Sequence, residues 1–310
     1  MDNEEKIATR ESFGRALSEL KENRIVVLDA DLDSSTKTEY FKKLYPDRFI
    51  QNGIAEADMI GTAAGLAACG KIPFASTFSA FATGRCYDQI RTSIAYPKLN
   101  VKICGTHSGI TVGEDGATHQ MLEDISLMRS LPNMTVISPA DDISTKALVN
   151  KIARYEGPVY LRLSRMNTPV IYKDDEKFEI GKGKQIGDGK DATIFSTGDV
   201  VAECIKAQEL LKNENINIRV VDMYSIKPID TELILKCASE TKVLFSVEDH
   251  NIIGGLGTAI ADILCEQCPK KLIKMGIPDC FGHSGRPSDL MKYFGIDANS
   301  IVEKIKEEIN

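Results

Sequence analysis

The sequence predicts an α/β fold built from two doubly wound, mostly parallel open sheets in tandem. Short apolar runs alternate with helical patterns along the chain, which is typical of parallel sheets with helices on both faces. One stretch interrupts the alternation, and it contains Pro169, several glycines and the charged run Lys173–Lys177. We therefore expect a first domain at residues 1–168, a linker at 169–190 and a second domain at 191–310.

The first domain begins with an amphipathic helix at residues 8–22, where Phe13, Leu17 and Leu20 share one face. Apolar runs of about four residues then predict buried parallel strands. These strands are expected at residues 25–28, 73–76, 101–104, 135–138 and 159–162. Helices are expected between them, at residues 54–69, 79–96, 120–130 and 141–154.

The second domain repeats the alternation over about 120 residues, an ordinary domain size. Its strands are expected at residues 192–196, 216–223, 243–247 and 272–276. Its helices are expected at residues 200–213, 230–239, 257–267 and 297–309.

Composition is that of a soluble globular protein and argues against several classes. The net charge of −7 comes without a basic block, so we expect no nucleic-acid partner. No apolar stretch of about 18 residues predicts a membrane span. The acidic N-terminus lacks the apolar core of a secretory signal. The eight cysteines lie in apolar segments and are expected to be reduced core thiols, which favours a cytoplasmic location.

The helix at residues 54–69 carries one acid, Glu56, in its first turn. Glu56 is either a helix-start carboxylate that complements the dipole, or a carboxyl group held out of water that exchanges a proton with a ligand. Small or narrow residues repeat along the helix and predict a face that another backbone can approach. They occupy positions 57, 60, 61, 64, 65 and 68.

A second candidate site is the loop Gly113–Gln120, which follows the strand at residues 101–104. Together with the preceding residues 105–109, this loop collects His107, Asp115 and His119. Loops at the carboxyl ends of parallel strands bind ligands in open α/β sheets, and histidines transfer protons near neutral pH. We therefore expect a functional site here.

Aromatic residues follow another strand end, and arginines elsewhere in the first domain are further candidates. Phe78 and Phe81 are one helical step apart, so they either pack in the core or form a stacking platform for a flat heterocycle. Three arginines are candidates to bind anionic groups, because the guanidinium fork suits phosphate oxygens. They are Arg10, Arg91 and Arg165.

These motifs, taken in order, resemble the C-terminal half of transketolase, as found in split transketolases made of two subunits. The resemblance covers nearly all of the chain and implies a thiamine-diphosphate pyrimidine-binding domain followed by a transketolase C-terminal-like domain. It rests on five blocks. They are Asn52-Gly-Ile-Ala-Glu56, Ser76-Thr-Phe-Ser-Ala-Phe81, the loop with His107, Gly113-Glu-Asp-Gly-Ala-Thr-His119, and Leu161-Arg-Leu-Ser-Arg165.

The resemblance implies a role for each cofactor-facing residue. Glu56 resembles the glutamate that hydrogen-bonds the aminopyrimidine of thiamine diphosphate and shares a proton with it. Phe78 and Phe81 resemble the aromatic wall against that ring, and Asp31 lies where the family places a residue near the cofactor and the subunit boundary. Many full-length transketolases have a tyrosine where this chain has Gly84. The wall is then either thinner here or completed by Tyr87.

The resemblance also implies the substrate class, a ketose phosphate that gives a two-carbon unit to an aldose phosphate. His107, Asp115 and His119 resemble the groups that bind sugar hydroxyls and reacting oxygens, and the two histidines suit the proton transfers. The residues that resemble the grip on the sugar phosphate are Arg10, Ser35 and Arg165.

We find no credible diphosphate and metal motif in this chain. Gly187-Asp-Gly189 follows a charged, glycine-rich segment rather than a buried strand, so we interpret it as a turn. Gly254-Gly-Leu-Gly257 lacks the third glycine of a dinucleotide fingerprint, so close helix packing is the expected reason for it. An N-terminal partner subunit with a Gly-Asp-Gly site is therefore expected to hold the diphosphate and Mg²⁺ (or Ca²⁺). The resemblance implies a two-fold heterotetramer and no activity of this chain alone.

Three alternatives stay open. The beta subunit of a 2-oxo-acid dehydrogenase is the nearest, although the Gly113–Gln120 loop with His107 favours sugar phosphates. Deoxyxylulose-phosphate synthase shares Tyr87-Asp-Gln89 and a similar loop, but is usually one long chain. A non-catalytic regulatory paralogue would keep the fold, and intact Glu56, His107 and His119 argue against it.

Overall fold

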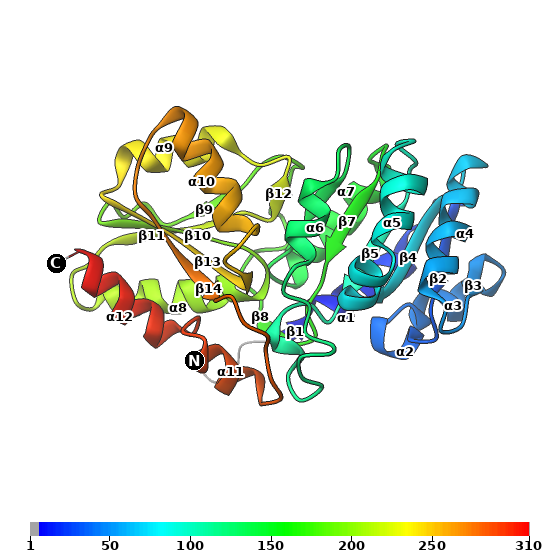
Figure 1. Ribbon diagram of the computed structural model, residues 1–310, viewed down its shortest axis with the longest axis horizontal. Coiled ribbons are helices and arrows are strands. Elements are labelled where there is room, and N and C mark those ends of the chain that lie inside the picture. The colour runs from blue at the N-terminus through cyan, green and yellow to red at the C-terminus, as the bar shows by residue number, and fades with distance from the viewer. Residues whose placement is uncertain (1–5, 310) are drawn as a thin grey trace.

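The computed structural model describes residues 6–309 and contains two α/β units that lie side by side (Figure 1). The predicted start of the first domain, residues 1–5, lies outside the described residues. The first unit holds a seven-stranded sheet and the second a five-stranded sheet. Each sheet is parallel apart from one edge strand, which confirms the predicted fold class. None of the helices in the described part of the chain is long and apolar enough to cross a membrane.

The seven strands of the first sheet run in the order β12-β6-β7-β5-β4-β2-β3. They are β2 (Ile25–Asp29), β3 (Phe49–Gln51), β4 (Ile72–Phe78), β5 (Lys102–Thr106), β6 (Thr135–Ile137), β7 (Val159–Arg162) and β12 (Ser225–Lys227). The helices of this unit are α1 (Thr9–Glu19), α2 (Asp33–Thr36), α3 (Glu39–Leu44), α4 (Glu56–Ala68), α6 (Asp124–Ser130) and α7 (Asp142–Arg154). The predicted helix at 79–96 forms in three pieces, because π-helical segments Ala80–Arg85 and Ile90–Ala95 flank the short α5 (Tyr87–Gln89).

The second sheet has the order β14-β13-β10-β11-β9. Its strands are β9 (Lys184–Ile186), β10 (Ala192–Ser196), β11 (Ile218–Asp222), β13 (Val243–Asn251) and β14 (Leu272–Ile277). Its helices are α8 (Val201–Lys212), α9 (Thr231–Glu240), α10 (Leu256–Gln267), α11 (Pro287–Tyr293) and α12 (Ala298–Ile309). A separate two-stranded sheet pairs β1 (Lys6–Ala8) with β8 (Asn167–Pro169).

The two units are joined by more than a simple linker, because a strand from the second half of the chain belongs to the first sheet. Strand β12 follows β11 in the chain but pairs antiparallel with β6 in the first sheet. Within the stretch predicted as a surface connection, Tyr172 and Phe178 are buried in a core of the first unit, and β9 pairs with β11. The predicted linker is therefore largely built into the two units, because its apolar side chains have core surface to cover.

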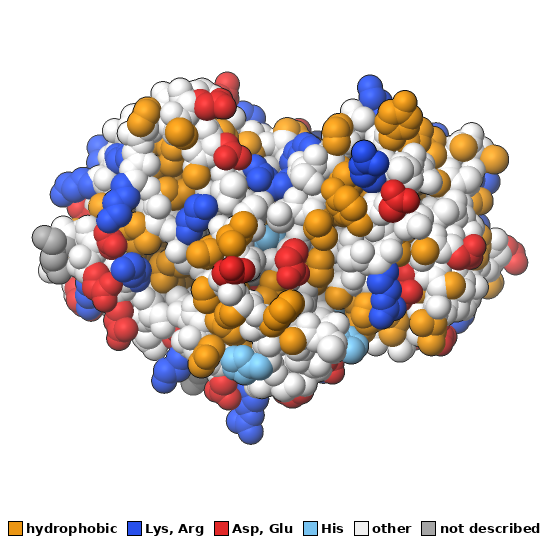
Figure 2. All heavy atoms as spheres, in the orientation of Figure 1, with side chains coloured by type: hydrophobic (Ala, Val, Ile, Leu, Met, Phe, Trp, Pro, Cys, Tyr) orange, Lys and Arg blue, Asp and Glu red, His pale blue; other side chains and the backbone are white. Residues whose placement is uncertain are grey.

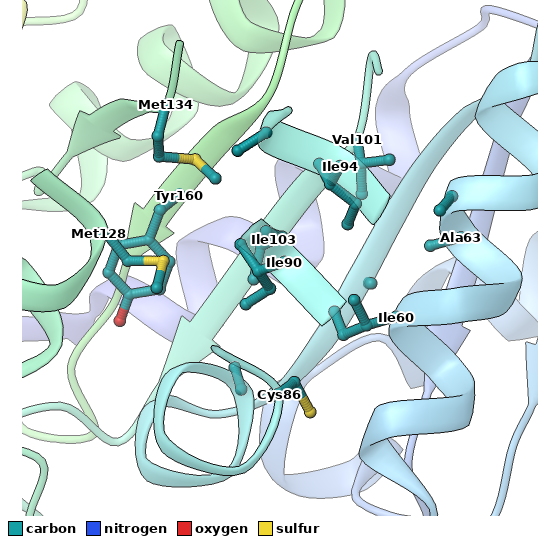
Figure 3. Close-up of a cluster of buried hydrophobic side chains, with 14 of the residues drawn as sticks. Ile60, Ala63, Cys86, Ile90, Ile94, Val101, Ile103, Met128, Met134 and Tyr160 are labelled. Atoms are coloured by element: carbon teal, nitrogen blue, oxygen red, sulfur yellow. The ribbon is translucent and has the colours of Figure 1, made fainter. Parts of the chain in front are cut away.

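A cluster of buried side chains holds α4 and the segment 80–95 against the first sheet (Figure 3). Ile60, Ile90, Ile103 and Met128 are fully buried there, and burial of such a side chain is worth about 1.5–3 kcal/mol. Only part of the narrow face predicted on this helix packs in this core. The remaining small positions, 57, 61, 65 and 68, are exposed.

The cysteines depart from the prediction that all eight are core thiols. Cys86, Cys104, Cys204 and Cys237 are buried, Cys268 is partly exposed, and the other three are exposed. All eight are free in the structure. Figure 2 shows Lys and Arg interspersed with Asp and Glu over one face of the molecule, with hydrophobic side chains between them.

Candidate functional site

The carboxyl ends of adjacent parallel strands bring most of the predicted residues together. Phe78 at the end of β4 lies directly beside Thr106 at the end of β5. His107 follows Thr106, and the loop to His119 leaves from the same point. Because parallel strands end at one edge of the sheet, residues nearly thirty positions apart in sequence become neighbours.

An aromatic cluster forms at this edge. The Phe78 ring stacks on His107 with centroids 3.8 Å apart, and on Phe81 with centroids 5.6 Å apart. His119 meets the Phe81 ring edge-on, with centroids 5.4 Å apart. Both predicted phenylalanines and both predicted histidines thus lie in one cluster. Phe78 and His107 are buried in it, and Phe81 and His119 are the partly exposed members that can meet a ring.

Glu56 is the first residue of α4, and it is buried at the side of this cluster. Its Oε1 accepts a hydrogen bond from Arg85 Nη1 at 2.9 Å. The Arg85 guanidinium in turn lies over the Phe81 ring, 4.0 Å from its centroid. Arg85 was not predicted as a site residue, although it follows Phe81 by one helical turn, and that spacing is the signal for it.

The space between Glu56 and Phe81 can be compared with the aminopyrimidine of thiamine diphosphate, because Arg85 lies between these two side chains. A planar group with N–H donors lies between the Glu56 carboxylate and the face of Phe81. An aminopyrimidine is likewise planar and presents nitrogen donors at its edge. The residues at this end of the site therefore fit the pyrimidine portion of the cofactor. Among residues 6–309, no group of three or more His, Cys, Asp or Glu side chains is arranged to hold a metal ion.

His107 is almost completely buried, and its two nitrogens have different partners. Nε2 lies 3.1 Å from Arg10 Nη1, and Nδ1 lies 2.9 Å from Thr106 Oγ1. A guanidinium can only donate, so Nε2 is the acceptor and the ring proton is on Nδ1. Burial, reinforced by the charges of Arg10 and Arg165, lowers the pKa of His107 to about 3. His107 is therefore a neutral hydrogen-bonding group at physiological pH.

The predicted anion-binding residues form a cationic rim beside His107, and we use that term for Arg10 and Arg165. Arg10 also donates to the backbone oxygen of Ser35 at 2.9 Å. Arg165 Nη1 donates to the oxygen of Val112 at 2.9 Å and to Asp115 Oδ2 at 3.1 Å. Burial lowers the pKa of Arg10, and the neighbouring Arg165 adds to the effect. The rim therefore carries positive charge that its own neighbours only partly neutralise.

Three predicted residues lie apart from this cluster. Asp31 is exposed after β2, with its backbone N–H bonded to Gln51. Arg91 lines a surface pocket with Tyr96 and Asn133. Tyr87 does not complete the aromatic wall, because it packs against the first core and its hydroxyl lies 3.2 Å from Ser130 Oγ. Arg85, rather than Tyr87, lies over the Phe81 ring beside Phe78 and His119.

The two glycine motifs are structural, as predicted. Gly187 has a φ of +74°, and a Cβ on Gly189 would lie 2.3 Å from the Asn217 oxygen, so the motif is a tight turn between β9 and β10. At the start of α10, Glu248 accepts from the backbone N–H groups of Leu256 and Gly257. An internal carboxylate thus occupies the anion-binding end of this helix.

Comparisons with known proteins agree with this geometry. The family described as "Transketolase, pyrimidine binding domain" matches residues 5–170, and "Transketolase, C-terminal domain" matches residues 181–301. A protein of Methanocaldococcus jannaschii, provisionally named a transketolase C-terminal section, is 52% identical over 97% of this chain and 96% of its own. A 6-deoxy-6-sulfo-D-fructose transketolase subunit of Clostridium sp. strain MSTE9 is 43% identical over 93% of this chain and 89% of its own.

A solved structure described as a split gene transketolase, inactive beta4 tetramer, superposes with a TM-score of 0.91 at 48% identity, covering 98% of each chain. Human transketolase is 40% identical over 97% of this chain, but the match covers 49% of its own length. The chain spans about half the length of the full-length transketolases that it matches.

The His107 ring should stay neutral from pH 8 down to pH 5. Its lowered pKa means that the unfolded chain binds a proton first, so the protein loses stability as pH falls from about 6.5 towards 3. We expect nitrogen-15 NMR of the histidine rings to show a constant Nδ1-protonated form for His107, assigned by its absence in His107→Asn. A midpoint near 6.5 for this ring would contradict the tautomer and the burial described above.

Proposed function

This chain belongs to the transketolase family, and on that premise we propose that it is the C-terminal subunit of a split, thiamine-diphosphate-dependent transketolase. The enzyme would transfer a two-carbon ketol unit from a ketose phosphate to an aldose phosphate. The observation that carries this proposal is one sheet edge on which a buried acid, an aromatic cluster and a cationic rim meet. Each is a group that the reaction requires.

Glu56, Phe78 and Phe81 would hold the pyrimidine end of the cofactor. Thiamine diphosphate, when bound, supplies a carbon nucleophile and an electron sink. The chain's part is to hold a proton at Glu56 Oε1 and to exclude water from the aromatic cluster. The Arg85 contact must open for Glu56 to do so, and Arg85 is more than half exposed, so the ion pair is worth at most about 1 kcal/mol.

The substrate would lie between the aromatic cluster and the cationic rim. Nε2 of neutral His107 accepts from Arg10 in the structure, and it would accept from a sugar hydroxyl once Arg10 turns to the phosphate. His119 and Asp115 would extend this polar surface. Arg10, Arg165 and the hydroxyl of Ser35 suit the terminal phosphate. The Clostridium relative is named for a sulfonated fructose. A sulfonate would use the same rim, so the test substrates include both anions.

A companion subunit is part of this proposal. It would carry the Gly-Asp-Gly site for the diphosphate and Mg²⁺ (or Ca²⁺), in a heterotetramer built on a two-fold axis. Support comes from the solved relative, whose tetramer of this one type of subunit is described as inactive. The exposed small positions of α4 beside Glu56 are where the companion or a second copy would approach. The proposed setting is cytoplasmic carbohydrate metabolism, with the pentose phosphate pathway as the expected route.

The purified chain should show no turnover with thiamine diphosphate, Mg²⁺ and sugar phosphates. Adding the companion subunit should restore activity, because the diphosphate end of the cofactor then has its ligands. The measurement is a coupled assay of ketol transfer, run with each subunit alone and with both. Turnover by this chain alone would refute the split-enzyme proposal.

Glu56→Gln should fold and assemble normally but lose roughly 100-fold or more of its turnover in the reconstituted enzyme, because the amide cannot exchange the proton. The matched control is Asp58→Asn, which removes an exposed acid from the same first helical turn. If Glu56 served only the helix dipole, both variants would lose a similar fraction of stability and neither would lose turnover.

Arg165→Ala should raise the KM for phosphorylated sugars roughly tenfold to a hundredfold, the usual loss for a hydrogen bond to a charged group. The KM for an unphosphorylated donor should change little. Arg91→Ala, which removes an arginine away from the cluster, serves as the control. Equal losses on both kinds of donor would show that Arg165 acts only by holding Asp115 and Val112.

A further inference from the structure

The loop that carries Asp115 and His119 is held from the second domain. Asp249, near the end of β13, is almost completely buried and points its carboxylate at the turn Ile110–Val112. Its Oδ1 accepts from the backbone N–H of Ile110 at 2.8 Å, and its Oδ2 from that of Thr111 at 3.3 Å. The backbone immediately after the His107 segment is thus bound by a side chain 139 positions away.

A second acid from the same domain reaches the same turn. The Thr111 hydroxyl donates to Asp199 Oδ2 at 2.8 Å, and Asp199 lies in a buried turn after β10. Gly109 shows how close the approach is, since its φ is +75° and a Cβ there would lie 2.0 Å from Asp249 Oδ2. Only glycine fits at this position.

The far end of the loop is fastened as well. Gln120 Nε2 donates to the backbone oxygen of His283 at 3.0 Å, and the Asn251 N–H donates to the Leu122 oxygen at 2.9 Å. Gly109 and Met121 close the loop on itself through a backbone hydrogen bond of 3.0 Å. Residues of the second domain therefore hold both ends of the segment 109–122. Its tip lies between Arg165, which bonds Asp115, and Ser284 of the second domain, whose Oγ would be 2.6 Å from a Cβ on Gly116.

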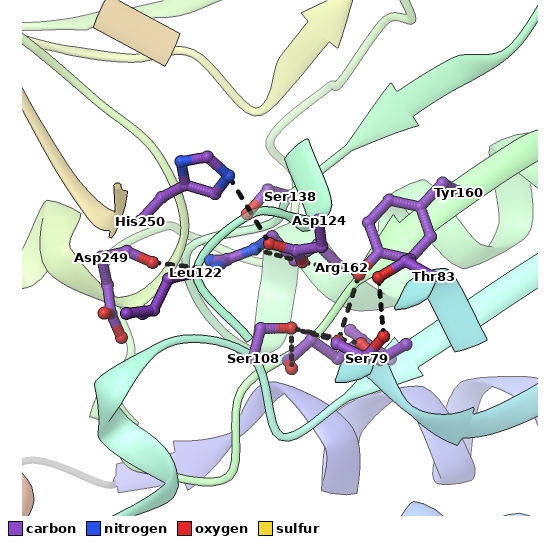
Figure 4. A network of polar contacts seen from close by, with 12 residues as sticks. Ser79, Thr83, Ser108, Leu122, Asp124, Ser138, Tyr160, Arg162, Asp249 and His250 are labelled. Carbon is purple, nitrogen blue, oxygen red and sulfur yellow. Dashed lines mark hydrogen bonds and ion pairs between the residues drawn. The ribbon is translucent and has the colours of Figure 1, made fainter. Parts of the chain in front are cut away.

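Asp249 is itself held by the first domain. Arg162, at the end of β7, donates to the Asp249 backbone oxygen at 2.8 Å and to Asp124 Oδ2 at 2.8 Å (Figure 4). Burial, reinforced by the nearby Asp199, raises the pKa of the Asp249 carboxyl to about 7, and Arg162 opposes that rise. A buried acid is unfavourable unless its acceptors are used, and here both oxygens are used by the loop.

We propose that Asp249 is a positioning residue through which the second domain sets the placement of loop 109–122, and with it Asp115 and His119. The catalytic consequence rests on the proposed function. The placement of the loop does not, because it is a property of the isolated chain. The second domain then shapes the substrate site by holding this loop, although none of its side chains has been assigned to that site.

Hydrogen exchange of the full chain, followed by mass spectrometry at pH 8, tests the placement directly. Asp249→Asn keeps the volume but loses one of the two acceptors, since an amide nitrogen cannot accept from the Thr111 N–H. We expect the amides of residues 109–121 to exchange about tenfold faster or more, while β4, β5 and β10 keep their protection. Thr111→Val, which removes the bond to Asp199 and the longer bond of 3.4 Å to the Ser108 oxygen, should give a smaller increase in the same segment.

Glu248→Gln is the matched control. Glu248 is the preceding residue, equally buried, but it caps α10 instead of the loop. This variant should accelerate exchange at residues 256–258 and leave the loop unchanged. Equal acceleration of the loop in Asp249→Asn and Glu248→Gln, or no acceleration in Asp249→Asn and Thr111→Val, would overturn the proposal.

The reconstituted enzyme supplies the second readout. Asp249→Asn should raise the KM for sugar phosphates about tenfold, with the Kd for thiamine diphosphate, measured by calorimetry, within about twofold of the original. A loss of cofactor affinity as large as the rise in KM would show general loosening and count against positioning. The unsubstituted protein separates the two proposals. If its loop amides are protected from exchange but it shows no transketolase activity with its companion, the proposed function is wrong and the loop placement stands.

Discussion

The buried ion pair between Arg162 and Asp124 is the interaction on which the rest of the structure depends. Arg162 is 4% exposed and Asp124 is fully buried, and Tyr160 adds a hydroxyl donor to the same carboxylate oxygen at 2.6 Å. Burial alone would lower the pKa of Arg162, but Asp124 and Asp249 outweigh it and raise that pKa. Loss of one partner would leave an uncompensated buried charge, which costs about 3–5 kcal/mol. The same guanidinium also donates to the Asp249 backbone oxygen at 2.8 Å, so this pair holds the arginine that joins β7 to β13 beside the loop.

The positive charge at the site has two effects. Arg10 and Arg165 would favour an anionic substrate under the proposed function, and they oppose protonation of the buried His107. An incoming phosphate would reduce that opposition, because it adds negative charge beside both guanidinium groups. The hydrogen-bonding state of His107 is therefore linked to what occupies the cationic rim, and the two cannot be tuned separately by changing one arginine.

The sequence was sufficient for features set by local patterns. Apolar runs located the parallel strands except β3, which has three residues and no resolvable period, and strand ends placed Phe78 near His107. Features set by distant pairings were out of reach. Arg85 meets Glu56 across 29 positions, and Asp249 meets Ile110 across 139. Tyr87 packs against the core near α6, where its hydroxyl lies beside Ser130, instead of joining the aromatic cluster. No local sequence pattern shows this contact.

The exchange of β12 into the first sheet has a consequence for inheritance. Recombination within residues 169–190 would separate the chain at its apparent joint, but it would also replace an edge strand of the first sheet together with both acids that hold the loop. A foreign second domain would be accepted only if it brought a compatible strand and carboxylates at both positions. A crossover at this joint is therefore expected to cost the protein an edge strand and the placement of the loop, although each domain resembles an independent module.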